Sequence, residues 1–456
     1  MKLKINLFAT CEIKKFYAAT VLYSFFFLVA IVPSKIFAID LEIGSPSAIL
    51  IDQVTGEIVY KKDPEQKMFP ASTTKVMTAL LTLEKNKDLN EKIKMSHDAI
   101  YNLEPGSSHI AMNEGETLTI EQALYALMVA SANEVANALA EYVSGDINNF
   151  CKLMNQRAKE LGCKNTNFVN AHGFHNENHY TSAYDLALIM REAVKYDEFN
   201  KIINTQRYEI PPTERQPQVR VLYNTNKMIH SGKFFYKNLI GGKTGYTDEA
   251  QHTLVSYAVK DNKKIICAVM GARNFDSFID TQKIFDYGFE CGFHDLNLIK
   301  KSDLEENCIV TQKYKNKIVD IDTVNVLLDK DINLSVPKEI KKSDLELKIK
   351  LPERVSAPIK KDSCLGYVNI YFKKRLIAQK KLFAQEDINL LDEKIIAKSE
   401  FKKLVRKIFA VSLRGLIYLS LIVCCFGLIL LLIRKINLGK QKEAKIYKFD
   451  RKRFKR

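Results

Sequence analysis

The sequence predicts an α+β protein, in which an antiparallel sheet with flanking helices is followed by a small all-β domain and a C-terminal membrane helix. Apolar residues at helical spacing follow position 72 and lie on both sides of residues 131–133. Two strand-like segments, residues 253–259 and 263–270, are joined by a short Asp-Asn turn and predict a β-hairpin. Residues 416–433 carry no charged side chain and are long enough to cross a bilayer.

Residues 1–38 have the pattern of a secretory signal peptide. Four lysines precede or adjoin an apolar stretch at residues 16–32, and Ala38 provides a small residue after which cleavage is expected. The alternative is an uncleaved membrane anchor, because the apolar stretch is close to the length that spans a bilayer.

Residues 72–75 read Ser-Thr-Thr-Lys and begin a predicted buried helix. Positions i and i+3 share a helix face, so Lys75 can reach the hydroxyl of Ser72, and the helix N-terminus favours developing negative charge there. Taken alone the pattern is weak, because it recurs at residues 335–338 and 399–402. An N-cap serine with a surface lysine is the alternative.

Two further polar motifs follow in the chain. Residues 131–133 read Ser-Ala-Asn between two apolar helical segments, where they form either a helix–helix turn or the wall of a site. Residues 243–245 read Lys-Thr-Gly just before the predicted hairpin. The glycine would let a ligand lie close against an edge strand.

The region after the hairpin changes in composition. Short alternating segments separated by turn residues predict an all-β domain over residues 293–390, which carries no candidate catalytic cluster. Residues 391–413 then read as a basic amphipathic helix, with a core-facing helix as the alternative. Residues 414–434 are the predicted transmembrane helix and residues 435–456 a basic tail.

The three motifs and their surroundings resemble the low-molecular-mass penicillin-binding proteins of the D-alanyl-D-alanine carboxypeptidase family, a group of serine peptidases. The resemblance extends over roughly residues 40–390. Further matching blocks lie at residues 48–52, 55–57, 69–81, 170–174, 179–187 and 224–226. The chain departs from the family pattern at Gln251, where glycine is frequent, and at Thr253, where cysteine is common.

The resemblance implies a β-lactamase/transpeptidase-like catalytic domain over residues 39–292 and removal of the terminal D-alanine from peptidoglycan stem peptides ending in D-Ala-D-Ala. It implies an acyl-enzyme, with β-lactam antibiotics as covalent inhibitors and with no cofactor or metal. The implied catalytic residues are Ser72, Lys75 and Ser131, and the implied substrate-binding residues are Asn133, Lys243, Thr244, Gly245 and Tyr246.

Three alternatives remain at this stage. A β-lactamase of the same fold would need a glutamate over the acyl-enzyme, for which Glu160 and Glu177 are the candidates. A catalytically inactive wall-binding protein is the second. A zinc site at His172, His175 and His179 is the third, although no H-E-x-x-H helix accompanies these residues.

The net charge of +16 indicates a membrane rather than a nucleic acid as partner. Most of this charge lies in residues 1–38 and 434–456, beside the apolar segments, and not on a folded domain. Positive residues stay on the cytoplasmic side of the membrane, so the tail is expected inside and residues 39–413 outside. The six cysteines outside the signal and the span show no paired spacing and are expected to be buried free thiols.

Overall fold

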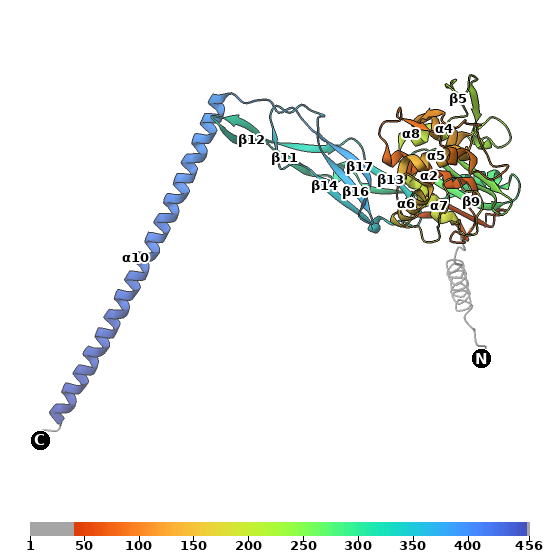
Figure 1. Ribbon diagram of the computed structural model, residues 1–456. Helices are drawn as coiled ribbons and strands as arrows, with labels where there is room; N and C mark the ends of the chain where they lie inside the picture. The colour runs from red at the N-terminus through yellow and green to blue at the C-terminus, as the bar shows by residue number, and fades with distance from the viewer. Residues whose placement is uncertain (1–40, 454–456) are drawn as a thin grey trace, which may run out of the picture. The chain divides into compact units, whose positions relative to one another are not determined.

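The computed structural model describes residues 41–453, and the predicted signal peptide at residues 1–38 lies outside this part of the chain (Figure 1). The described chain forms two compact units. The first contains residues 41–295 together with Ser335–Lys341, and the second contains Leu296–Leu334 and the chain from Lys342 onward.

A five-stranded antiparallel sheet forms the centre of the first unit, with the strand order β2-β1-β9-β8-β7. The predicted hairpin is confirmed, with its turn at Asp261 and Asn262, both of which have positive φ. Strand β7, which carries the Lys-Thr-Gly motif, lies at the edge of the sheet. The strands are β1 (Ser47–Asp52), β2 (Ile58–Lys62), β7 (Leu239–Thr247), β8 (Gln251–Lys260) and β9 (Lys263–Ala272).

Helices cover both faces of this sheet, because successive apolar side chains of β1 point to opposite faces and each face needs a cover. Ile49 and Ile51 pack into a cluster with the helices around α2, whereas Ala48 and Leu50 pack with α9 on the opposite face. The helices are α2 (Lys75–Lys85), α3 (His97–Tyr101), α4 (Ile120–Val129), α5 (Asn133–Ser144), α6 (Ile147–Glu160), α7 (Ala183–Ala193), α8 (Asp197–Ile203) and α9 (Asp276–Cys291).

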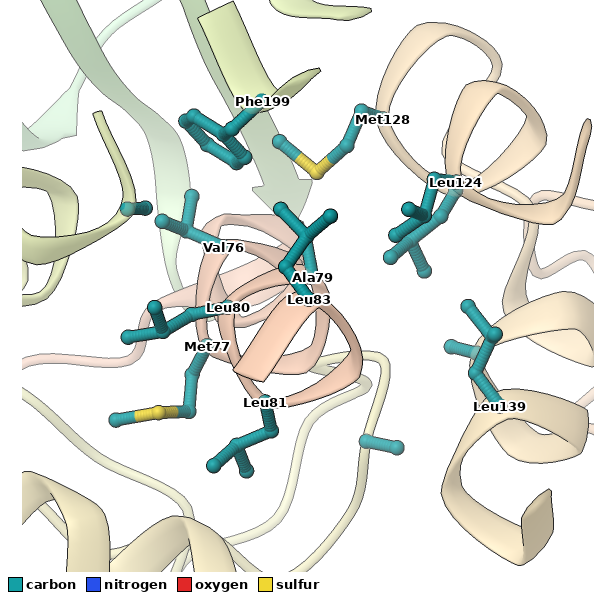
Figure 2. Close-up of a cluster of buried hydrophobic side chains, with 14 of the residues drawn as sticks. Val76, Met77, Ala79, Leu80, Leu81, Leu83, Leu124, Met128, Leu139 and Phe199 are labelled. Atoms are coloured by element: carbon teal, nitrogen blue, oxygen red, sulfur yellow. The ribbon is translucent and has the colours of Figure 1, made fainter. Parts of the chain in front are cut away.

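Helix α2 lies in the middle of the larger hydrophobic cluster. Its apolar side chains point outward in all directions and meet Leu124 and Met128 of α4 and Leu139 of α5 (Figure 2). Burial on every side holds the helix that follows Ser72 in a fixed position. This confirms the buried helix that the apolar run predicted.

Short elements complete the first unit. The 3-10 helix η1 (Ala71–Thr74) leads into α2, and η2 (Lys227–Ile229) precedes β7. Strand β3 (Lys92–Lys94) pairs with β4 (Thr117–Thr119), and β5 (Arg207–Ile210) pairs with β6 (Arg220–Tyr223).

The second unit contains the predicted all-β domain, which the structure confirms as a six-stranded sheet of order β14-β16-β17-β12-β11-β15. Its neighbours are antiparallel except for β11 and β15. Strand β10 (Phe293–Ile299) pairs with β13 (Ile332–Pro337), and η3 (Lys301–Asp303) and η4 (Lys342–Asp344) are short turns. The sheet strands are β11 (Glu306–Tyr314), β12 (Lys317–Leu328), β14 (Leu345–Lys350), β15 (Arg354–Ser356), β16 (Cys364–Phe372) and β17 (Arg375–Ala384).

A single continuous helix, α10 (Glu393–Arg453), contains both the predicted amphipathic segment and the predicted span. By length and composition its apolar part is able to cross a membrane. The thiol prediction is correct for Cys151, Cys163, Cys267 and Cys308, which are free and buried. It is wrong for Cys364, which is exposed at the first position of strand β16, and Cys291 is only partly buried.

Candidate active site

Ser72 and Lys75 meet where η1 continues into α2. The Lys75 Nζ atom lies 3.0 Å from Ser72 Oγ, as the helical spacing predicted. The same Nζ donates to Asn133 Oδ1 and to the carbonyl oxygen of His172, each at 2.7 Å. Lys75 is completely buried, so its amine makes hydrogen bonds to these three groups and none to bulk water.

The electrostatic environment favours a neutral Lys75. Burial lowers the pKa of Lys75 well below its ordinary value, and the nearby positive charge of Lys243 lowers it further. The carboxylate of Glu134 acts in the opposite direction and is the weaker influence. A neutral amine beside a serine hydroxyl can accept the proton of that hydroxyl.

Ser131 and Asn133 lie at the junction between α4 and α5. Ser131 has a φ of 64°, in the left-handed region, so its backbone conformation is strained. Its Oγ atom is buried and has no hydrogen-bond partner among the described residues, and its side chain lines the cleft. A strained backbone and an unpaired hydroxyl are typical of a group held ready for a reacting molecule.

The Lys-Thr-Gly motif divides between the cleft and the interior. Thr244 faces the cleft, and its Oγ1 lies 2.6 Å from Oγ1 of Thr225. Lys243 is 1% exposed and donates from Nζ to the carbonyl oxygen of Thr244. Burial lowers the pKa of Lys243 to about 7. Tyr246, which follows Gly245 on the strand, is exposed and lines the cleft.

Gly245 has a structural role in addition to the ligand contact that the sequence predicts. A Cβ atom at this position would lie 2.9 Å from both the Ser72 nitrogen and the Pro70 carbonyl oxygen and would also collide with Thr253. The glycine therefore lets β7 lie directly against the start of the nucleophile helix. The same glycine lines the cleft, where a ligand lying against the edge strand remains the sequence prediction.

These residues surround one open cleft with a volume of about 750 Å³. Ser72, Ser131, Asn133, Thr244, Gly245 and Tyr246 line it, whereas Lys75 and Lys243 lie beneath its surface. Residues 105–108 form part of its lining, as do Thr225, Lys227 and Phe275. The structure therefore brings all eight predicted site residues together.

The sequence singled out His172, His179 and Thr253 but did not predict how they support the site. The His172 carbonyl oxygen binds Lys75, and the hydroxyl of Thr253 donates to Pro70 beside the nucleophile. His179 Nε2 lies 2.8 Å from Thr74 Oγ1. The matching blocks at residues 170–174 and 179–187 indicated that the segment with these histidines belongs to the site. They could not show that Lys75 is bound by the main-chain oxygen of His172.

Two of the alternatives can be compared with the geometry. Among residues 41–453, no group of three or more His, Cys, Asp or Glu side chains is placed to hold a metal ion. Glu160 pairs with Arg157 on α6, and Glu177 is exposed beside His175. Neither glutamate lines the cleft.

A family model described as D-alanyl-D-alanine carboxypeptidase matches residues 34–274, more than half of the chain. The chain belongs to the D-alanyl-D-alanine carboxypeptidase family. It is therefore a hydrolase of the peptidase class. A second model, for the C-terminal domain of penicillin-binding protein 5, matches residues 297–390, within the all-β unit.

Comparison with individual proteins and solved structures agrees with this family. The chain is 33% identical to the carboxypeptidase DacF of Bacillus subtilis over 75% of this chain and 85% of the relative. Among solved structures, penicillin-binding protein 5 of Haemophilus influenzae matches 76% of this chain and 98% of its own, at 26% identity and a TM-score of 0.52. The DD-transpeptidase of Streptomyces K15 matches 54% of this chain and 98% of its own, at 29% identity and a TM-score of 0.51.

Proposed function

We propose that this enzyme removes the terminal D-alanine of peptidoglycan stem peptides through an acyl-enzyme on Ser72. The contact between Ser72 Oγ and the buried Nζ of Lys75, at 3.0 Å, carries the proposal. A neutral Lys75 donates its two N–H groups to Asn133 and His172 and receives the hydroxyl proton of Ser72 on its lone pair.

The activated Ser72 oxygen attacks the carbonyl carbon between the two D-alanines. The developing oxyanion accepts hydrogen bonds from the main-chain N–H groups of Ser72 and Tyr246. The close approach of Gly245 to the Ser72 nitrogen supports this pairing, because Tyr246 is the next residue on the same strand.

Ser131 passes a proton to the departing D-alanine amine, and Asn133 orients the substrate amide. The unpaired Ser131 hydroxyl in the cleft supports this role. The terminal carboxylate binds at the hydroxyl of Thr244, and the charge of Lys243 acts on it from beneath the strand. Water then releases the acyl-enzyme, and β-lactams acylate Ser72 in the same way.

The proposed location follows from the ends of the chain. Residues 1–38 direct export, residues 39–292 and 293–390 act outside the cell, and residues 391–413 lead to a span at residues 414–434. The basic residues 435–456 remain in the cytoplasm. The continuous α10 helix, whose apolar part has the length and composition of a span, supports this arrangement.

Substitution of the nucleophile tests the proposed chemistry. The variant Ser72→Ala of the full-length protein should lose both D-alanine release from a D-Ala-D-Ala peptide and covalent labelling by a fluorescent penicillin. Ser335→Ala and Ser399→Ala, at the other two Ser-x-x-Lys patterns, are matched controls and should retain both. Labelling of the Ser72 variant would place the nucleophile elsewhere.

A further inference from the structure

Residues 105–108 line the cleft and belong to a loop. The same loop contains a strained turn at Ile110 and Ala111. Ala111 in this turn has a φ of 54°, a left-handed conformation that non-glycine residues rarely adopt. Such a conformation persists only where the surrounding contacts hold it. The contacts that hold this turn therefore fix the wall of the cleft.

Two buried side chains hold the turn, Glu134 at a main-chain N–H group and Arg220 at carbonyl oxygens; burial raises the pKa of the Glu134 carboxyl, and hydrogen bonds from the turn act against that rise. Glu134 accepts a hydrogen bond on Oε1 from the Ile110 N–H at 2.7 Å. Arg220 donates to the carbonyl oxygens of Ile110 and Ala111 at 3.0 and 2.9 Å. Arg220 is itself paired with the buried carboxylate of Glu116 at 2.7 Å.

Glu134 also adjoins the catalytic contacts. It follows Asn133 in the first turn of α5, and Asn133 accepts from Lys75 at its side chain. The Asn133 main-chain N–H donates to the carbonyl oxygen of Ser108, in the cleft wall, at 2.9 Å. Glu134 is 1% exposed, and its Oε2 has no hydrogen-bond partner among the described residues.

We infer that Glu134 is a positioning residue that sets the cleft wall against the nucleophile and places a negative charge near the proton-accepting lysine. This inference rests on the proposed roles of Ser72 and Lys75. Glu134 itself touches neither substrate nor the reacting atoms. Glu134 binds the cleft-wall loop at Ile110, and its neighbour Asn133 in the first turn of α5 binds Lys75.

The charge of Glu134 has a measurable consequence. The ionisable groups around Lys75 are Glu134 on α5, Lys243 on β7, and His172 and His179 on the segment before α7. Of these, only Glu134 stabilises the protonated amine. Loss of its charge therefore lowers the pKa of Lys75, so the neutral form persists to lower pH.

Two substitutions separate position from charge in the full-length enzyme. Glu134→Gln keeps the length and an oxygen that accepts from Ile110, but it removes the charge. The acid limb of the pH profile of kcat/KM for D-alanine release should move to lower pH. Glu134→Asp keeps the charge but shortens the reach to Ile110. Its kcat/KM should fall about tenfold through misplacement of the wall, with the acid limb unmoved.

Glu141→Gln on the same helix, where the carboxylate binds Ser96 away from the cleft, is the control and should match the wild type in both measurements. An unmoved acid limb in Glu134→Gln, or wild-type kcat/KM in Glu134→Asp, would overturn the inference. Failure of the underlying mechanism would instead appear as penicillin labelling of Ser72→Ala, so the two failures are distinguishable.

Discussion

Lys75 has no access to water, and its amine contacts three oxygen atoms from three different parts of the chain. An unpaired buried charge is costly, and the two bonds to Asn133 and His172 fit a neutral amine with one lone pair left for Ser72. The burial of Lys75 therefore contributes to its reactivity as well as to the stability of the core.

Lys243 lowers the pKa of Lys75, whereas Glu134 raises it, so removal of the Lys243 charge should have a measurable effect. Lys243→Met keeps the side-chain volume but removes a positive charge that lowers the pKa of Lys75. The pKa of Lys75 should rise, so the acid limb of kcat/KM should move to higher pH. Preference for a free over an amidated terminal carboxylate should also fall.

Lys227→Met is the matched control, because Lys227 lines the same cleft but does not contribute to the lowered pKa of Lys75. Its acid limb should coincide with that of the wild type. An acid limb that stays in place in Lys243→Met would show that burial alone keeps Lys75 neutral.

Sequence spacing was sufficient to predict the contact between Ser72 and Lys75, because i and i+3 share a helix face. It could not predict the contact between Lys75 and the His172 carbonyl oxygen, since this oxygen reaches Lys75 only through the fold of a loop distant in sequence. Nor could it predict that Lys243 lies beneath the cleft surface. A lysine in a strand motif gives no sign of its own burial.

Among the elements, strand β7 and helix α2 determine the site by their close approach. The strand reaches the Ser72 nitrogen because Gly245 lacks a side chain there, and Thr253 on the next strand binds Pro70 from the same side. Periodicity predicted α2 and the hairpin correctly. It could not predict the distance between them, which depends on packing between segments far apart in the chain.

This contact predicts a severe effect of Gly245→Ala. The added Cβ would meet main-chain atoms of Pro70 and Ser72, which cannot move without shifting the nucleophile. Overpacking of this kind destabilises a protein by about 1–3 kcal/mol. The rate of penicillin acylation should fall strongly. The midpoint of thermal unfolding, measured on the same variant, reports the accompanying loss of stability.

Gly145→Ala supplies the comparison for this substitution. Its φ of 86° is left-handed, whereas that of Gly245 is not, and a Cβ at residue 145 meets no atom within 4 Å. It should lose about 1–2 kcal/mol through backbone strain alone and acylate at the wild-type rate. Equal acylation rates in the two variants would show that the approach of β7 to Ser72 is not required.

At the scale of the whole molecule, composition predicted the succession of an α+β unit, an all-β unit and an apolar helix. Each type of unit has its own hydrophobic period, and the period can be counted from the sequence. Composition did not show that the amphipathic segment and the predicted span form one continuous helix. No proline separates them, and α10 runs through both.

The final prediction concerns the direction in which this helix crosses the membrane. The charge-free residues 416–433 are flanked by basic residues on the tail side, and such residues resist translocation. Protease added to intact protoplasts should therefore digest residues 39–413, while an epitope placed after Arg456 survives. A chain that ends before α10 should appear in the medium as active enzyme. Digestion of the epitope in unbroken cells would mean that α10 lies along the outer membrane surface, with its apolar side chains in the lipid and its lysines in water.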